Sequence, residues 1–568
     1  MSPNDLPVAA PRRRRSARVR SWSRAGLIAV VCAGLVIPNV ALNPVTPPAS
    51  AAPSTPNIVV ILTDDQPKGM IETMPVLRDY VVPTSTTFAN AVTPTSVCCP
   101  SRTSLLTGKY SNESGVYGIN RKKFGGYKVF QAKGNQHESV PVKLNNAGYA
   151  TGLFGKYLNG YRIDSGEPRP PGWNRWTATV ENDGGNKYTD YRYTADAPDL
   201  ALAESAGAPT YEQRSQGEYV TSHMGKAAVD FIEEVPSEVP LFAVYTPYAP
   251  HAPFTPEPKF AGAGVNPPWK KTPDSEKNVS DKPHWVQEQP KKAKVEGMEP
   301  RAVWRKQTAV LRSVDEQVGL IIEALERTGR WENTLLVFTS DNGYAFGQNR
   351  VTSKNNPYRP SSEVDLIVRY PGQQEAAQNG DLVTANVDVA ATLLTAAGLP
   401  NSTSGLPLGT SGGRLGIPMM GTWNKMRGRK RPPYCGWRTT DELFVRYGSK
   451  EEEYYNYRID PGGKENLIPI EPVAKKGKKG KKKPARIKKL NRKQLGNDWD
   501  VVVYIDGVLE QRTQKRGATT KQGVVLHVLD GGKRLGMRRS DETFDAKPAN
   551  ILVLSDHLGS GSVELDWS

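Results

Sequence analysis

Cysteine and histidine are scarce in this chain, which has four cysteines and six histidines among its 568 residues. So few cysteines exclude a small domain that depends on a framework of disulfides. Cys32 lies in an apolar N-terminal run, which leaves Cys98, Cys99 and Cys435 for the rest of the chain. If Cys98 has a chemical role, the other two are the remaining pair, and a Cys99–Cys435 disulfide in an oxidising compartment is a hypothesis.

Acidic residues are in deficit, with 58 Asp and Glu against 75 Lys and Arg and a formal net charge of +17. The excess is mostly local, because Lys475–Lys493 contains 12 basic residues and no acidic one. A nucleic-acid partner is therefore not indicated. The tract lies in a predicted linker, residues 471–497, and is typical of solvated, disordered chain. Contact with a polyanion, such as a cell-wall polymer or a sulfated glycan, is the alternative.

The N-terminus has the pattern of a secretory signal peptide, which we assign to residues 1–51. Arginines within Arg12–Arg20 precede the apolar run Ala25–Leu42, and Ala49–Ala51 provides a small-residue cleavage site. Pro38 interrupts the run, which favours cleavage over a retained membrane anchor. The arginines also allow the twin-arginine route. We expect an exported protein that is secreted or associated with the cell envelope.

Acidic and amide side chains follow two apolar segments that are typical of buried strands. Asp64 and Asp65 come directly after Asn57–Thr63, and Asp341 and Asn342 follow the second segment, which begins at Leu335. Taken alone, Asp-Asp is more often a turn or helix cap, and Asn-Gly a hairpin turn. Together, two such strand ends could form an oxygen-rich cage for Ca²⁺ or Mg²⁺.

The segment Val97–Gly108 is the most specific pattern in the chain. Pro100 suits the first turn of a helix, so Cys98 should lie at the positive helix end with Arg102 one turn further on. An anion above Cys98 would then meet backbone N–H groups and a guanidinium. A free cysteine before an ordinary helix is the alternative for such a stretch taken alone.

This segment resembles the signature of the type I sulfatases, of the alkaline phosphatase superfamily: Cys-x-Pro-Ser-Arg followed by Leu-Thr-Gly. The resemblance, which extends over Pro56–Leu467, implies that a formylglycine-generating enzyme converts Cys98 to Cα-formylglycine, whose hydrate is the nucleophile. It implies that Arg102 helps to hold this hydrate. It also implies a Ca²⁺ site, with Mg²⁺ as the alternative, whose ligands would be Asp64, Asp65, residue 98, Asp341 and Asn342.

Three further positions match the sulfatase pattern and imply contacts with sulfate or the leaving alcohol: Lys156, His251 and Lys354. Many sulfatases have a second active-site histidine two residues after the first lysine, where this chain has Leu158, so the base for sulfate release is unassigned. The Gly-Lys-Tyr-Leu-Asn form is similar to that of N-acetylglucosamine-6-sulfatases. We interpret the remaining histidines as structural or surface residues: His137, His223, His284, His527 and His557.

The resemblance implies an α/β fold with a large mixed β-sheet flanked by helices on both faces and a smaller C-terminal antiparallel sheet with one helix. Ala302–Thr328 and Val387–Gly398 have helical patterns. We expect a catalytic domain at 52–430, a small β subdomain at 431–470 and an extension at 498–568. The extension has three strand-like runs and no chemical motif, so an accessory β module and a poorly ordered tail are equally open.

The sequence thus predicts a sulfuric ester hydrolase that releases sulfate from a sulfated glycan or a small sulfate ester. Two other functions stay open. A phosphate or phosphonate monoester hydrolase could use the same scaffold, and an inactive sulfatase-like protein could bind polyanions through its lysine tract. The sequence contains no pattern that identifies the sugar, the sulfate position or endo against exo action.

Overall fold

The structure, a computed structural model, describes residues 55–470 apart from 120–123, 162–168, 181–186, 197–209, 271–275, 381–382, 411–415, 423, 427–428 and 469. Beyond residue 470 it describes five strands between Trp499 and Leu554. The predicted signal peptide and the lysine tract lie outside the described residues. The chain divides into two compact units, residues 1–471 and 472–568. Within the described residues, no helix has both the length and the apolar character needed to cross a membrane.

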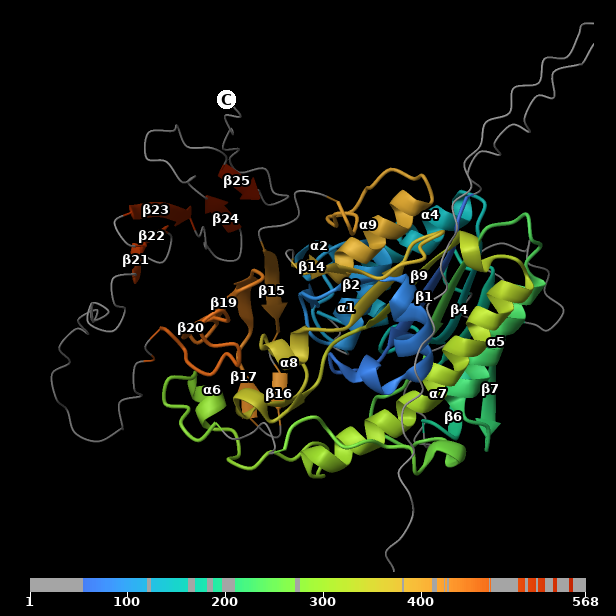
Figure 1. Ribbon diagram of the computed structural model, residues 1–568, viewed down its shortest axis with the longest axis horizontal. Coiled ribbons are helices and arrows are strands. Elements are labelled where there is room, and N and C mark those ends of the chain that lie inside the picture. Colours follow the sequence, from blue (N-terminus) through green and yellow to red (C-terminus); the bar gives the residue numbers. More distant parts are fainter. Residues whose placement is uncertain are drawn as a thin grey trace, which may run out of the picture. The chain divides into compact units, whose positions relative to one another are not determined.

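A ten-stranded mixed β-sheet is the centre of the first unit (Figure 1). The strands in sheet order are β13 (Ala377–Asn379), β2 (Thr86–Phe88), β12 (Leu366–Arg369), β9 (Thr334–Ser340), β1 (Asn57–Thr63), β8 (Leu241–Thr246), β4 (Ala150–Lys156), β5 (Arg175–Thr179), β6 (Asp190–Asp196) and β7 (Thr210–Gln216). From β9 to β5 the strands are parallel. The neighbours β12 and β6 join this parallel group antiparallel.

Helices cover both faces of the sheet (Figure 1). The amphipathic helices α5 (Val220–Glu234) and α7 (Pro300–Arg327) pack together on one face, and α1 (Cys98–Thr107), α4 (Val140–Asn146) and α9 (Asn386–Ala396) lie on the other. Every residue of β1 is buried because both of its faces are covered. The strand predicted at Asn57–Thr63 is confirmed as β1. The helices predicted at Ala302–Thr328 and Val387–Gly398 are confirmed as α7 and α9.

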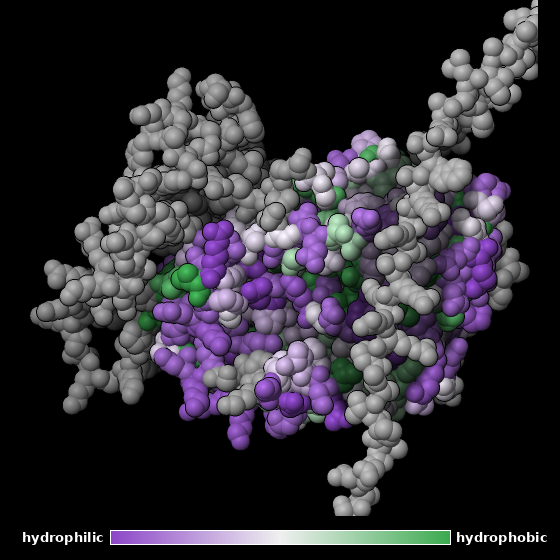
Figure 2. Space-filling model, in the orientation of Figure 1, coloured by the Kyte–Doolittle hydropathy of each residue, from purple (hydrophilic) through white to green (hydrophobic). Residues whose placement is uncertain are grey.

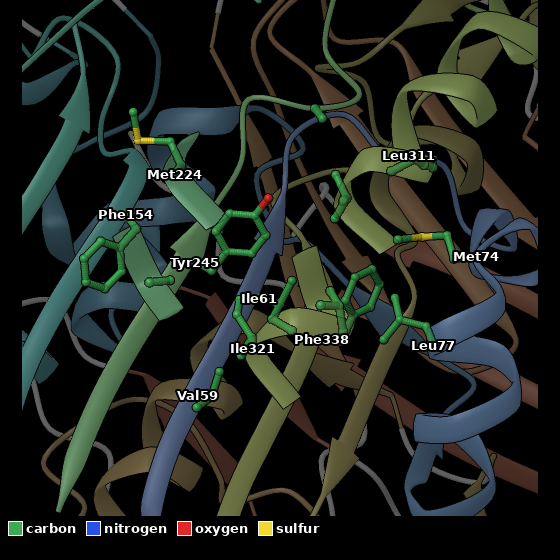
Figure 3. Close-up of a cluster of buried hydrophobic side chains, with 14 of the residues drawn as sticks. Val59, Ile61, Met74, Leu77, Phe154, Met224, Tyr245, Leu311, Ile321 and Phe338 are labelled. Atoms are coloured by element: carbon green, nitrogen blue, oxygen red, sulfur yellow. The ribbon is translucent and has the colours of Figure 1, made fainter. Parts of the chain in front are cut away.

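Alternate residues of β1 belong to different hydrophobic cores. Val59 and Ile61 join Ile321 of α7 and Phe338 of β9 in the first core (Figure 3). Ile58 and Val60 belong to the second core, beneath α1, α4 and α9. Burial of this apolar surface on both sides holds the central strands in register.

A separate four-stranded antiparallel sheet forms the C-terminal part of the first unit, in the order β15 (Ile417–Gly421), β18 (Tyr434–Arg438), β19 (Glu442–Tyr447) and β20 (Glu452–Asn456). Trp285 of the short helix α6 (His284–Gln287) packs against Tyr447, with ring centroids 6.0 Å apart. The predicted fold class is therefore confirmed. The exterior in the view of Figure 2 is mostly hydrophilic over the described residues.

Short elements connect these layers. They are α2 (Ser111–Ser114), α3 (Tyr127–Ala132), α8 (Arg359–Ser362), and the strand pairs β3 (Ala91–Val92) with β14 (Thr384–Ala385), β10 (Ala345–Phe346) with β11 (Thr352–Ser353), and β16 (Asn424–Met426) with β17 (Arg429–Arg431).

The hypothesis of a Cys99–Cys435 disulfide is wrong in this structure, where neither cysteine belongs to a disulfide. Cys99 is fully buried in α1 as part of the second core. Cys435 lies on β18 of the small sheet and is only partly buried. The two thiols thus belong to different layers.

The second unit contains an antiparallel three-stranded sheet of β21 (Trp499–Ile505), β22 (Leu509–Arg516) and β23 (Thr519–Leu526), and a pair of β24 (Leu535–Arg538) with β25 (Ile551–Leu554). The three apolar runs that were predicted as strands overlap β21, β23 and β25. Strand β22 was not predicted, because it contains several charged residues and lacks an apolar alternation.

Candidate active site

The predicted site residues gather at the carboxyl ends of four neighbouring parallel strands, β9, β1, β8 and β4. Ligands commonly bind at this edge of an α/β sheet. Two acidic residues follow β1, the Asp-Asn pair follows β9, Lys156 is the last residue of β4, and His251 lies five residues beyond β8. The residues brought together in this way are Asp64, Asp65, Lys156, His251, Asp341 and Asn342.

Cys98 is the first residue of α1, after the extended residue Val97. The helix ends at Gly108, whose φ of 66° is left-handed and suits glycine. All ten residues of α1 are buried, and Cys98 itself is 1% exposed. The Cys98 Sγ lies 3.5 Å from Asp64 Oδ1, so the thiol and the β1 carboxylate face one another.

Arg102 holds three of the strand ends together. Its Nε donates to Asp341 Oδ2 at 2.7 Å, and its Nη1 donates to the Lys156 carbonyl at 2.7 Å and to Thr246 Oγ1 at 2.6 Å. The guanidinium is 2% exposed. Arg102 therefore fixes the Asp341 carboxylate relative to the ends of β4 and β8.

Strands β4 and β8 approach each other closely at this edge. Gly155 has a φ of 122°, and a side chain there would collide with the Thr246 carbonyl, which lies 2.0 Å from the position of an added Cβ. Only glycine fits such an approach. The next residue, Lys156, can therefore direct its ammonium to the carboxylates.

Two lysines neutralise the acidic residues. Lys156 forms a buried ion pair with Asp64. The Lys354 Nζ lies 2.5 Å from Asp65 Oδ1 and 2.6 Å from Cys98 Sγ, so its ammonium lies between the second carboxylate and the thiol. Burial alone would lower the pKa of both lysines, but the carboxylates outweigh burial and raise it.

The acidic residues respond differently to this environment. Burial would raise the pKa of Asp64, but Lys156, His251 and other cations around it hold that pKa well below its usual value. Burial, with the nearby charge of Asp64, raises the pKa of Asp65 despite the opposing effect of Lys354. Burial also raises the pKa of the Cys98 thiol, which disfavours the thiolate form of an unmodified Cys98.

The donor atoms fit a hard cation. One donor atom each from Asp64, Asp65, Cys98 and His251 lie within 4.8 Å of one another. Asn342 donates from Nδ2 to Asp65 Oδ1 at 2.6 Å, and its buried Oδ1 has no hydrogen-bond partner among the described residues. Such an orphaned oxygen beside two carboxylates suits Ca²⁺ or Mg²⁺. Of these donors, those of Asp64, Asp65, Asn342 and residue 98 would hold the ion.

Asp341 lies beside this group but has other partners. Its Oδ2 accepts from Arg102, and its Oδ1 accepts from the Asp65 backbone N–H at 3.2 Å. The carboxylate thereby connects α1 to the end of β1. The sequence placed Asp341 at the right strand end but contained no signal for its pairing with Arg102.

His251 lies at the margin of the site, with its side chain 24% exposed. Its Nε2 is 3.5 Å from Asp65 Oδ2, and its Nδ1 faces the opposite way. Burial lowers the pKa of the imidazole, against the raising effect of Asp64. Of the other histidines, His223 contacts Tyr191 and His284 contacts Glu451, and neither is near this group.

Leu158 is 2% exposed and belongs to the second hydrophobic core. The side chain is thus surrounded by apolar groups. Sequence reasoning missed two polar groups of the site, Thr246 beside Arg102 and Tyr248 beside His251. The available signal was their position at the carboxyl end of a buried strand, since Thr246 is the last residue of β8 and Tyr248 lies two residues beyond it.

Comparisons with known proteins identify the family of this chain. The model of the sulfatase family matches residues 56–399. Human N-acetylglucosamine-6-sulfatase is 31% identical over 406 residues, which cover 69% of each chain.

Two solved structures share the fold. One is that of a protein in complex with its substrate D-glucosamine-2-N,6-O-disulfate, with a TM-score of 0.60 and 20% identity over 73% of this chain and 93% of the other. The other, a phosphonate monoester hydrolase of Agrobacterium radiobacter, has a TM-score of 0.54 and 17% identity over 72% and 91% of the two chains.

Proposed function

Since the chain belongs to the sulfatase family and is a sulfatase, we propose that it hydrolyses the sulfate ester of an amino sugar through a formylglycine derived from Cys98. One observation carries the proposal: residue 98 lies against both the carboxylate of Asp64 and the ammonium of Lys354. A nucleophile at this position would have a cation beside it to receive the sulfate oxygens.

The reaction proceeds in two steps at residue 98. One hydroxyl of the hydrated aldehyde attacks sulfur in line with the leaving alcohol, and the bond from sulfur to the alcohol oxygen breaks. The proton of the attacking hydroxyl passes through His251 Nε2 to the alcohol oxygen. The second hydroxyl then loses its proton, the carbonyl re-forms and inorganic sulfate leaves. Addition of water to the aldehyde restores the hydrate.

The other charged side chains of the site bind sulfate, position the strand ends or hold the metal ion. Lys156 and Lys354 hold sulfate oxygens, and Arg102 keeps Asp341 and the strand ends in place. A Ca²⁺ ion, or Mg²⁺ as the alternative, would be held by Asp64, Asp65, Asn342, residue 98 and Asp341. When bound, the ion supplies positive charge for the sulfate oxygens.

Two similar proteins support the proposed substrate class. The human relative is an N-acetylglucosamine-6-sulfatase, and one structural neighbour has a 6-O-sulfated glucosamine as its substrate. We therefore propose a 6-O-sulfated amino sugar as the substrate. Export through the N-terminal signal and modification by a formylglycine-generating enzyme belong to the same proposal.

The test is mass spectrometry of the tryptic peptide that contains residue 98, combined with assays on sulfated monosaccharides. We expect the mass of formylglycine and sulfate release from N-acetylglucosamine 6-sulfate. An unmodified thiol throughout an exported, active protein would contradict the nucleophile. Activity only on other sulfate positions would contradict the substrate.

The phosphonate monoester hydrolase among the structural neighbours favours one competing function. A tetrahedral phosphoryl group would fit the same anion pocket. Aryl sulfate and aryl phosphate esters with the same leaving group distinguish the two. A higher kcat/KM for the phosphate ester would replace the sulfatase proposal.

A further inference from the structure

The imidazole of His251 has two close oxygen neighbours on the side away from the carboxylates. Its Nδ1 lies 2.8 Å from the Ala252 carbonyl oxygen and 2.7 Å from the Tyr248 hydroxyl. The Tyr248 hydroxyl also donates to the Ala252 carbonyl at 2.9 Å. The three polar atoms therefore form a closed triangle behind the ring.

This triangle determines which nitrogen carries the hydrogen. A carbonyl oxygen can only accept, so Nδ1 must be the donor to Ala252. The Tyr248 hydroxyl gives its own hydrogen to the same carbonyl, and its oxygen can accept from Nδ1. In the neutral ring, Nε2 is then the nitrogen without hydrogen, and it is the one that faces Asp65.

Burial and contacts with two neighbouring side chains fix the position of Tyr248. Its side chain is 6% exposed, and Lys187 Nζ donates to its hydroxyl at 2.8 Å. The neighbouring Tyr188 is fully buried, packs edge-on against the Tyr248 ring and donates to the His251 carbonyl at 2.6 Å. The backbone and the ring of His251 are thus fixed by different tyrosines.

We propose that Tyr248 is a positioning residue for the sulfatase reaction, which keeps the His251 ring oriented with Nδ1 protonated and Nε2 directed into the site. The inference rests on the proposed role of His251. Tyr248 itself does not touch the reacting atoms. The Tyr248 hydroxyl acts by orienting the imidazole. Loss of this hydroxyl should therefore affect the chemical step more than substrate binding.

The kinetic test uses Tyr248→Phe, which keeps the ring and removes the hydroxyl. We expect kcat to fall by about 5-fold to 10-fold, the value of one hydrogen bond, with KM changed less than about 2-fold. Tyr245→Phe is the matched control, because Tyr245 is an equally buried tyrosine of β8 whose hydroxyl donates to the Thr221 carbonyl at 3.0 Å. It should leave kcat unchanged.

The double variant with His251→Ala separates positioning from general damage. If Tyr248 acts through His251, adding Tyr248→Phe to His251→Ala should not reduce kcat further. An equal loss in both backgrounds, or an unchanged kcat in the single variant, would overturn the proposal.

A spectroscopic test does not depend on activity. In protein with ¹⁵N-labelled histidine, the His251 signals, assigned by their loss in His251→Ala, should show a protonated Nδ1 and an unprotonated Nε2. Tyr248→Phe should change this tautomer balance, and Tyr245→Phe should not. A wild-type ring protonated at Nε2, or identical spectra for Tyr248→Phe, would overturn the proposal. If no sulfate ester is cleaved, the proposed function fails, but the spectra still decide the positioning.

Discussion

Two buried carboxylate groups of this protein have opposite surroundings. In the active site, Asp64 and Asp65 are paired with lysines and face the Cys98 thiol. In the small C-terminal sheet, Glu453 is equally buried, but it accepts hydrogen bonds from three tyrosine hydroxyls: those of Tyr358, Tyr447 and Tyr455.

This difference distinguishes a ligand-binding site from a buried carboxylate whose hydrogen bonds have a structural role. The tyrosines occupy both oxygens of Glu453 with neutral donors, so no position is left for a ligand. The active site instead gathers cations, acidic groups and the Cys98 thiol, and it leaves Asn342 Oδ1 without a partner among the described residues. Buried charges add little to stability, so their concentration here indicates function.

The largest effect is expected at the nucleophile. Cys98→Ser leaves one hydroxyl, which cannot collapse to a carbonyl, so sulfate should remain bound covalently or turnover should fall by about 10⁴-fold. Single-turnover assays and intact mass of the protein measure both outcomes. Cys435→Ser, on the small sheet, is the control and should keep full activity. Undiminished multiple turnover by Cys98→Ser would defeat the mechanism.

The second-largest effect is expected on metal removal, which should involve the active-site carboxylates and leave Glu453 unaffected. Dialysis against a chelator should lower kcat by about 10²-fold, and Ca²⁺ should restore it, because the ion stabilises the sulfate oxygens. Ca²⁺ should also raise the Tm of the metal-free protein. This rise should persist in Glu453→Gln and disappear in Asp65→Asn. A Ca²⁺ response in Asp65→Asn equal to that of the wild type would place the ion elsewhere.

The smallest effect concerns the pH dependence of stability. Burial raises the pKa of Glu453 to about 7, above the 4.5 of an exposed glutamate. The folded state therefore holds a proton that the unfolded state releases between these values, and stability falls as pH rises through this window, by at most about 3 kcal/mol. In Glu453→Gln, the free energy of unfolding should no longer fall in this pH window, because the side chain cannot ionise.

Urea unfolding of the wild type and Glu453→Gln at pH 5 and pH 8 measures the effect. The wild type should lose more free energy of unfolding than the variant between these pH values. Parallel losses in the two proteins would show that the tyrosines keep Glu453 ionised throughout.

Sequence patterns predicted individual central strands because these are unbroken apolar runs that end in polar residues, whereas the fold class was implied by the resemblance to sulfatases. They also indicated which strand ends would meet, since Asp64 and Asp341 follow parallel neighbours. They could not predict partners that depend on side-chain direction across layers. The pairing of Arg102 with Asp341 and the contact of Tyr248 with His251 are of this kind, and so is the separation of Cys99 from Cys435.

The burial of α1 constrains when the protein can mature. Cys98 is 1% exposed, and the whole helix around it is enclosed by the fold. A second enzyme cannot bring its own active site to a side chain in this position. The proposed oxidation of Cys98 would therefore take place before α1 docks. A molecule that folds before this step would keep an unmodified thiol at residue 98.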